Sequence, residues 1–194
     1  DYSQQIELVK QLSHLPPPEC VGDLWLERFS PYYTRPEEYG VTITGPGEAY
    51  PYVYDSENID LFKIAYDFEF TTKNEIEPSL KKELTEIVQN WKARHQSDDL
   101  PYLFFTKSMN FVTVYDDRSI GNPNKNRFEG APASIIVFCN ESPKTMVQIE
   151  KHIRELSMEE GAAEKGVLQL ERMGILYGEK GKYLTLALPH NANL

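Results

Sequence analysis

Apolar residues recur at helical spacing in the first half of the chain and predict three helices there. The first begins after Ser3, which can cap it, and ends before the prolines at 16–18. The second covers residues 56–70, and the third starts at Pro78 and ends in the polar run at 94–99. Residues 23–29 are expected to form a strand, and residues 30–54 an ordered loop rich in aromatics.

The pattern changes after residue 98. Short alternating segments predict strands at 101–105, 111–117 and 127–130. Helices are expected over residues 131–139, 142–156 and 157–174, with Ser142 capping the second of them. In the third, Ser157 and Glu160 have the spacing of a capping box, and Gly174 would end the helix. Residues 175–188 predict a hairpin with its turn at 178–181.

This order of elements predicts an α+β protein made of two domains. Residues 1–98 would form a helical segment with an aromatic-rich loop. Residues 99–194 would combine a small antiparallel sheet, helices and a hairpin, which is the order of a winged helix-turn-helix-like domain.

The composition is typical of a water-soluble globular protein. Apolar residues make up 40% of the chain, and no apolar run approaches the roughly 20 residues of a membrane span. A net charge of −10 argues against broad neutralisation of nucleic-acid phosphates. Cys20 and Cys139 are too few for a disulfide framework, so a cytoplasmic location is expected. Because the chain opens at Asp1 and a helix follows almost at once, we expect a fragment of a longer polypeptide.

The charge of the last predicted helix decides between two uses of a winged helix. Its acidic residues Glu159, Glu160, Glu164 and Glu171 outnumber its basic residues, the wrong sign for a helix that enters the major groove of DNA. A peptide is the expected ligand instead, bound as an added strand with its side chains in a groove beside a helix.

We expect that groove between the strand at 127–130 and the last helix. Phe128, Val167 and Leu170 would supply its apolar contacts, and Arg127 or Glu171 its polar ones. Since a buried helix stripe has the same pattern, Val167 and Leu170 are equally compatible with a place in the core.

Catalytic chemistry finds little support in the sequence. The histidines are scattered without an obvious partner nearby in sequence, so surface positions are expected for them. Asp116 and Asp117 beside Arg118 could form a carboxylate dyad, but acidic residues at the end of a strand are a simpler explanation. Cys139 lies on an apolar helical face and is expected in the core.

The opening half contains the text "LWLERFSPYYTRPEEYG", then "AYPYVY" and "AYDF". The region from His14 to Phe70 resembles the segment after the catalytic barrel in the cobalamin-dependent radical-SAM maturases of ribosomally made, post-translationally modified peptides. The motifs that recur among members of that family in this region are "LxRFSPY", a proline, an aromatic-glycine pair, "AYxYxYP" and "AYxF". The matching residues are Leu26, Arg28, Phe29, Ser30, Pro31, Tyr32, Pro36, Tyr39, Gly40, Ala49, Tyr50, Tyr52, Tyr54, Ala65, Tyr66 and Phe68.

The resemblance implies a parent enzyme that methylates carbon in a precursor peptide. It would hold a 4Fe-4S cluster, S-adenosylmethionine and cobalamin. The family's CxxxCxxC motif and its cobalamin-binding domain do not occur in this sequence, so both are expected upstream of Asp1 and no cofactor is expected in the chain itself. The C-terminal region would hold the leader part of the precursor peptide. Its other partners would be the upstream radical-SAM and cobalamin-binding domains of the same polypeptide.

The same resemblance implies a role for the aromatic-rich segment. It would flank the barrel and shield a radical intermediate from water. Arg28 and Arg35 would pair with carboxylates of the peptide or of a cofactor. Rigid walls would come from Tyr32, Tyr33, Tyr50 and Tyr52. In a simpler alternative, Arg28 pairs with Glu27 or Glu38 and the tyrosines only pack.

Two other classes of protein stay open. One is a stand-alone adaptor that binds a leader peptide unaided. The other is an acidic winged-helix regulator that acts through protein contacts and shifts a promoter fragment in a salt-sensitive gel assay.

Overall fold

The structure, a computed structural model, describes residues 2–73, 75–119 and 121–190. The protein is mixed α and β with small, mainly antiparallel sheets, and it divides into two compact units. One unit comprises residues 19–85, and the other comprises residues 3–18 together with the chain from residue 86 onward. The compact units therefore differ from the expected functional division after residue 98, because residues 3–18 and 86–98 cluster with the C-terminal region.

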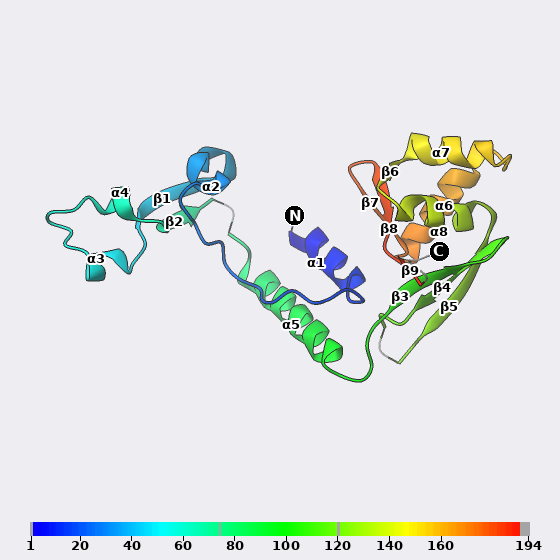
Figure 1. Cartoon of the computed structure of the whole chain (residues 1–194), viewed down its shortest axis with the longest axis horizontal. Coiled ribbons are helices and arrows are strands. Elements are labelled where there is room, and N and C mark those ends of the chain that lie inside the picture. Colours follow the sequence, from blue (N-terminus) through cyan, green and yellow to red (C-terminus); the bar gives the residue numbers. More distant parts are fainter. Residues whose placement is uncertain (1, 74, 120, 191–194) are drawn as a thin grey trace. The chain divides into compact units, whose positions relative to one another are not determined.

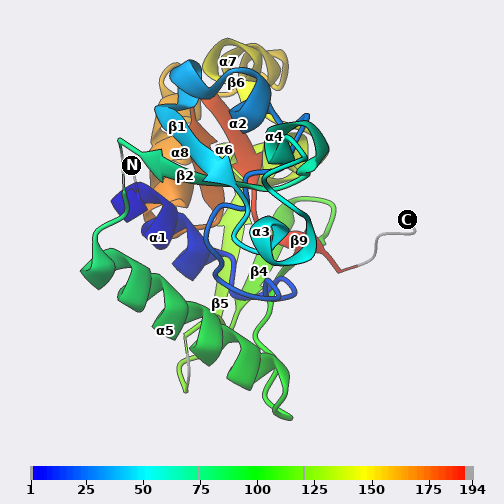
Figure 2. The ribbon, with the colours of Figure 1, turned by 90° about the vertical axis from the view of Figure 1, so that its left-hand side faces the viewer.

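The unit of residues 19–85 is built of short elements around a two-stranded antiparallel sheet, whose strands lie side by side in Figures 1 and 2. Its small core consists of Leu26, Val41, Ala65 and Phe68. The elements are α2 (Pro31–Thr34), the 3-10 helix η1 (Pro36–Tyr39), β1 (Val41–Pro46), α3 (Tyr50–Val53), α4 (Leu61–Ile64) and β2 (Phe68–Thr72).

Two of the predictions for this unit are wrong. Residues 23–29, all of them described, contain a single β-bridge between Glu27 and Asp67 instead of a strand. The helix predicted over residues 56–70 is reduced to the one turn of α4. Phe68 begins β2 instead, because it is buried against β1 while Glu69 beside it is exposed, which is the alternation of a strand.

Two longer helices follow the predicted stripes, α1 (Tyr2–Gln11) and α5 (Pro78–His95). Helix α5 starts at its proline as predicted. The indole N–H of Trp91 donates to the Leu15 carbonyl at 2.8 Å and so fixes the segment after α1 to the second half of α5. Ser3 lies inside α1 and is not its cap, contrary to the prediction.

The C-terminal unit contains a four-stranded sheet with helices packed on one of its faces (Figure 1). The sheet order is β5-β4-β3-β9, antiparallel except for β3 and β9. The strands are β3 (Leu103–Lys107), β4 (Phe111–Asp116), β5 (Asn124–Glu129) and β9 (Leu188–Pro189). The helices are α6 (Gly130–Asn140), α7 (Met146–Glu155) and α8 (Ala162–Arg172). A second sheet, with order β6-β8-β7, consists of β6 (Lys144–Thr145), β7 (Leu176–Glu179) and β8 (Lys182–Thr185).

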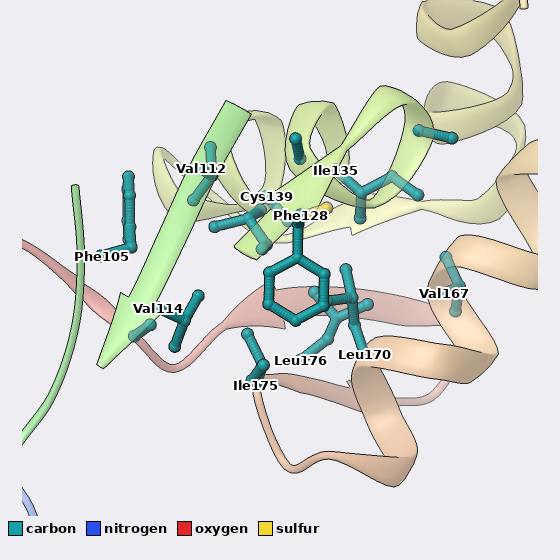
Figure 3. Packing of buried hydrophobic residues seen from close by; sticks show 14 of the residues in the cluster. Phe105, Val112, Val114, Phe128, Ile135, Cys139, Val167, Leu170, Ile175 and Leu176 are labelled. Atoms are coloured by element: carbon teal, nitrogen blue, oxygen red, sulfur yellow. The ribbon is translucent and has the colours of Figure 1, made fainter. Parts of the chain in front are cut away.

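One continuous core joins the larger sheet, the helices and the hairpin of this unit. Figure 3 shows the ring of Phe128 in the middle of that core, close to Leu170 and Leu176. Ile135 and Cys139 of α6 are completely buried beside it, so the prediction of Cys139 in the core is confirmed. These contacts stabilise the strands whose edges and faces form the candidate sites.

The helix starts in this unit differ from those predicted. Helix α7 is capped by Thr145, which forms a capping box with Gln148, so the prediction of Ser142 as the cap is wrong. Helix α8 begins after Gly161, whose φ of 78° is left-handed, and the predicted capping box of Ser157 and Glu160 is wrong because both precede the helix.

The hairpin and the end of α8 are confirmed. Strands β7 and β8 pair in antiparallel register, and the turn residues Lys180 and Gly181 have φ values of 50° and 73°. Both signs fit the type I′ turn that suits the twist of a hairpin. Gly174 has a φ of 62° and follows α8, which ends one residue earlier at its C-cap Met173.

Candidate functional site

Strand β5 lies at the edge of the larger sheet. It pairs with β4, and no other described strand pairs with it. The Ser108 N–H donates to the Phe111 carbonyl at 2.9 Å. The Asp117 N–H donates to the Tyr102 carbonyl at 2.8 Å. The odd-numbered residues of β4 therefore bond to β3, and its even-numbered residues bond to β5.

This register leaves a row of backbone groups pointing away from the sheet. The backbone N–H and C=O groups of the even-numbered β5 residues bond to β4, so those of the odd-numbered residues Lys125 and Arg127 face the open edge. Glu129 adds its N–H there, while its carbonyl, at the N-cap of α6, accepts the first bond of that helix. An extended peptide could hydrogen-bond to these groups as a further strand.

The opposite edge of the sheet is closed to such pairing. Strand β9 covers β3 there, is only two residues long and ends in Pro189, which has no N–H to donate. A short edge strand with a proline is a common way to block strand addition. The sheet therefore has one long open edge among the described residues, at β5.

Cationic side chains of β5 lie over aromatic rings on the face of the sheet turned away from the core. The Arg127 guanidinium is 3.7 Å from the ring centre of Phe111, and the Lys125 ammonium is 5.2 Å from that of Tyr115. Arg127 also pairs with Glu129 at 2.8 Å, and both side chains are more than half exposed. In a protein with a net charge of −10, this face beside the open edge can attract an acidic peptide.

The apolar residues predicted for a peptide groove lie inside the core. Phe128 and Val167 each expose 4% of their surface, and Leu170 exposes none. Figure 3 shows them packed with one another beneath β5, so they support the strand and form no open groove. Glu171 is half-buried and lines a different hollow of about 440 Å³, which it shares with Asn124 at the start of β5.

Arg28 uses its side chain within the unit of residues 19–85. Its Nε–H donates to the Ala65 carbonyl at 2.6 Å, and a terminal N–H donates to the Phe62 carbonyl. Another terminal N–H donates to the Tyr33 hydroxyl at 3.3 Å, and the guanidinium lies 5.1 Å from the ring centre of Phe68. These groups are its hydrogen-bond partners among the described residues, in place of the expected acidic partners.

The other residues predicted for the aromatic segment fall into separate groups. Arg35 pairs with Glu38 at 3.0 Å and lies near Tyr39, whose ring is 4.6 Å from that of Tyr32. Tyr33 packs on the core residue Phe68 with ring centres 4.7 Å apart.

Tyr50 and Tyr52 differ sharply in their surroundings. The Tyr50 hydroxyl accepts a hydrogen bond from the Tyr66 N–H at 2.7 Å, and its ring is stacked 6.0 Å from that of Tyr54. Tyr52 is 91% exposed. The predicted walls are therefore not one surface: the structure brings Arg28 together with Tyr33, and leaves Tyr52 in solvent.

A second candidate site is a pocket of about 540 Å³ between the β3–β4 turn and the helices α6 and α7. Ser134 of α6 and His152 of α7 line it, with 2.8 Å between Oγ and Nε2. The His152 ring is stacked on Phe138 with ring centres 4.1 Å apart and 5° between the planes. Ser134 and His152 are 18 residues apart, and no local pattern predicted their contact; the one signal was a serine inside the apolar stretch 131–139.

His14 is buried, so the prediction of a surface position for it is wrong. Its Nε2 lies 3.0 Å from the Leu186 carbonyl oxygen. Its Nδ1 and the Ser13 hydroxyl have no hydrogen-bond partner within the described part of the chain. Burial lowers the pKa of His14 below its ordinary value, and the nearby positive charge of Arg118 acts in the same direction.

The acidic pair at the end of β4 forms ion pairs with two arginines. Arg118 contacts the Asp116 carboxylate at 2.6 Å, and Arg94 contacts the Asp117 carboxylate at 3.2 Å. Burial raises the pKa of Asp116, but the hydrogen bonds and positive charge of Arg118 outweigh it and hold the pKa below its usual value. Because both carboxylates are neutralised by arginine, they are not arranged as a dyad that shares a proton.

The described residues show neither a metal-binding cluster nor a membrane-spanning helix. In residues 2–73, 75–119 and 121–190, no three His, Cys, Asp or Glu side chains are grouped so that they could hold a metal ion. None of the described helices combines the length and apolarity needed to cross a membrane. The cofactors predicted for an upstream part of the polypeptide stay a prediction.

Comparison with protein-family models, with curated proteins and with solved structures found no match for this chain. The resemblance to the radical-SAM peptide maturases therefore depends on the residues matched between His14 and Phe70.

Proposed function

We propose that this protein captures a peptide as an added strand at the open edge of β5. The observation that supports the proposal is the row of open backbone groups on the long open edge of the described sheet: the N–H and C=O of Lys125 and Arg127 and the N–H of Glu129. Backbone hydrogen bonds along such an edge supply affinity, and side chains beside it supply specificity. The neighbouring Lys125 and Arg127 side chains favour a peptide that carries acidic residues.

The order of elements behind the sheet supports a winged-helix-like domain. Helix α6 is followed by β6, α7, α8 and the β7–β8 hairpin, and β8 lies between β6 and β7. The same arrangement occurs in DNA-binding winged helices, but α8 has no net charge, because Glu164 and Glu171 balance Lys165 and Arg172. The helix therefore offers no net positive charge to phosphates.

We also propose that the peptide is a leader sequence and that the chain is the C-terminal portion of a cobalamin-dependent radical-SAM peptide C-methyltransferase. The residues matched in the aromatic segment support this part. Exposed aromatic side chains in the unit of residues 19–85 are consistent with a surface that another domain covers. Among them are Trp25, Phe29 and Tyr52, with exposed fractions of 68%, 77% and 91%.

Amide hydrogen exchange tests the β5 proposal directly. Peptides would be selected from a random display library on the full chain, and one would be synthesised and added to saturation. The amides of Lys125, Arg127 and Glu129 should then exchange at least about tenfold more slowly, because each N–H gains a partner. Those of Asn126 and Phe128 already bond to β4 and should change little. Protection confined to other elements would contradict the proposal.

A pair of variants separates the backbone of β5 from its side chains. Arg127→Pro removes an N–H that faces the open edge and should abolish peptide binding. Arg127→Ala keeps the N–H and should weaken binding only a few-fold. Equal loss in both variants would show that the side chain, and not the added strand, carries the affinity; circular dichroism of both variants checks that they are folded.

The family part of the proposal has a separate test. Iron, sulfide and cobalt would be measured in the complete gene product after anaerobic purification. We expect iron and sulfide in the amounts of one 4Fe-4S cluster, together with bound cobalamin. A product without metal would overturn the maturase proposal and leave peptide capture at β5 as the function of an adaptor.

A further inference from the structure

The pocket beside α6 and α7 has the properties of a small-ligand site. Its volume of about 540 Å³ lies within the range of roughly 300–1,000 Å³ that is usual for such sites. None of the three residues whose backbone groups face the open edge of β5 lines it. Ligand binding in this pocket therefore does not depend on peptide capture at that edge.

Most of the pocket wall is apolar or aromatic. Val112 of β4, Val137 and Phe138 of α6 and Leu156 after α7 line it. The Phe138 ring is stacked on the His152 ring, and the Lys144 ammonium lies 4.7 Å from the centre of the Phe138 ring, so this part of the wall is aromatic. Met158 also lines the pocket, and thioethers make favourable contacts with the edges of aromatic rings.

Six polar residues line the pocket, and four of them are exposed: Lys107, Ser108, Asn110 and Glu141. The other two form a pair. Ser134 and His152 are half-buried and bonded to each other, with Oγ and Nε2 2.8 Å apart. If the hydroxyl donates to Nε2, its oxygen can still accept a bond from a ligand. If the ring N–H donates to the hydroxyl, the hydroxyl proton can still be donated to a ligand. The pair therefore suits a ligand group that can both donate and accept.

We propose that this pocket binds a phenol ring, the group found in a tyrosine side chain. The aromatic residues and Met158 of the wall fit a ring, and a phenolic hydroxyl can both donate to and accept from the Ser134–His152 pair. A purely aliphatic group would leave the remaining hydrogen-bonding capacity of the Ser134 hydroxyl unused. The phenol can belong either to a peptide or to a free small molecule.

The same pair does not have the arrangement of a nucleophilic catalytic site. A serine nucleophile needs a histidine base that is itself oriented by a third group. Among the described residues, no carboxylate forms a hydrogen bond with His152. Ser134 also lies inside α6, between Ala133 and Ile135, which are both buried. Ligand binding is the use that these contacts support.

The test is a titration of the full chain, labelled with nitrogen-15, with p-cresol and separately with toluene. Both probes should shift the amide signals of residues around the pocket, including Ser134, Phe138 and His152. The p-cresol should bind about 2- to 10-fold more tightly, as expected for one net hydrogen bond. Shifts confined to other parts of the chain, or equal affinity for the two probes, would overturn the proposal.

Variants then locate the hydrogen bond. Ser134→Ala should bring the affinity for p-cresol down to that for toluene and leave toluene binding unchanged. Ser79→Ala is the matched control, because Ser79 is an exposed serine at the start of α5. If Ser134→Ala keeps the preference for p-cresol, the assignment of the pair is wrong. Unchanged toluene binding shows that the variant is folded.

Two further probes identify the source of the phenol. N-acetyl-tyrosinamide carries the ring on a peptide backbone, and N-acetyl-phenylalaninamide is its control without the hydroxyl. If the tyrosine compound displaces p-cresol and the phenylalanine compound does so more weakly, the pocket accepts a peptide side chain. If neither competes but p-cresol still binds with its preference, the ligand is a free phenol. Protection at β5 without any p-cresol shift would leave peptide capture standing and remove the pocket proposal alone.

Discussion

Arg28 shows how the role of a single residue depends on contacts that sequence cannot reveal. In an aromatic stretch, an arginine suggests a site for an anion, but here its donors go to carbonyls of residues 62 and 65. Those carbonyls lie at the end of α4, where the helix leaves its last acceptors unsatisfied. Arg28 thus closes a helix end and fixes the segment that precedes α2. A lysine could not replace it, since it lacks the forked donors.

His14 gives a prediction about pH. Because burial lowers its pKa in the folded protein, the unfolded chain binds the proton more readily. The stabilising contribution of neutral His14 is complete above its ordinary pKa of 6.5 and is lost as the pH falls below that value toward the folded pKa. Urea unfolding at a series of pH values should show the decline. The His14→Gln variant should show a smaller decline over the same range, and an equal one would contradict the assignment.

At the scale of single residues, the sequence predicted which side chains are buried better than it predicted their hydrogen-bond partners. The apolar face of the helix at 131–139 correctly pointed to Cys139 as an interior residue, because burial follows from periodicity. His14 bonds to a carbonyl 172 residues away, and the Ser134–His152 pair joins two helices. Such contacts depend on how elements pack, and no local pattern encodes them.

Among the elements, residues 61–72 show why a strong helical pattern can fail. Leu61, Ile64, Ala65 and Phe68 have helical spacing, yet Phe68 and Phe70 also alternate with the exposed Glu69 and Thr71. Pairing with β1 satisfies the backbone of the second half as a strand, so the helix stops after one turn. Pairing with β1, which is distant in the sequence, therefore selected the strand where the helical and strand patterns overlap. The elements after residue 100 were predicted more closely, since each has one period and clear turn residues.

Arg118 joins the ends of β4, α1 and α8, and its removal should lower the stability of the fold. It contacts Asp116 and donates to the carbonyls of Gln11 and Gly174 at 3.0 and 2.9 Å. Its side chain is only 11% exposed. Arg118→Met should lower the free energy of unfolding by about 3 kcal/mol, since it leaves a largely buried carboxylate without a counter-charge. Urea denaturation measures the change.

The control for this prediction is Arg127→Met. Arg127 and its partner Glu129 are 57% and 64% exposed, so the loss should stay below about 1 kcal/mol. In the double variant Asp116→Asn with Arg118→Met, part of the lost stability should return because no charge is left unpaired. If the two single variants lost the same free energy, burial would not be the reason for the role of Arg118.

For the whole molecule, charge separates the peptide proposal from the regulator alternative. With a net charge of −10 and no net positive charge on α8, the chain should not retard duplex DNA in a gel at physiological salt. The assay would use duplexes of random sequence, with a basic DNA-binding protein as the positive control. Retardation that weakens steeply as salt is raised would favour the regulator.

The two edges of the larger sheet also limit how many strands can be added to that sheet. A strand added at β5 meets a closed edge at β9 on the far side, so the sheet grows once and then stops. Even two copies that pair β5 with β5 would use up both of their open edges and end as a dimer. This asymmetry permits a one-to-one complex and prevents the larger sheet from extending into a fibrous polymer.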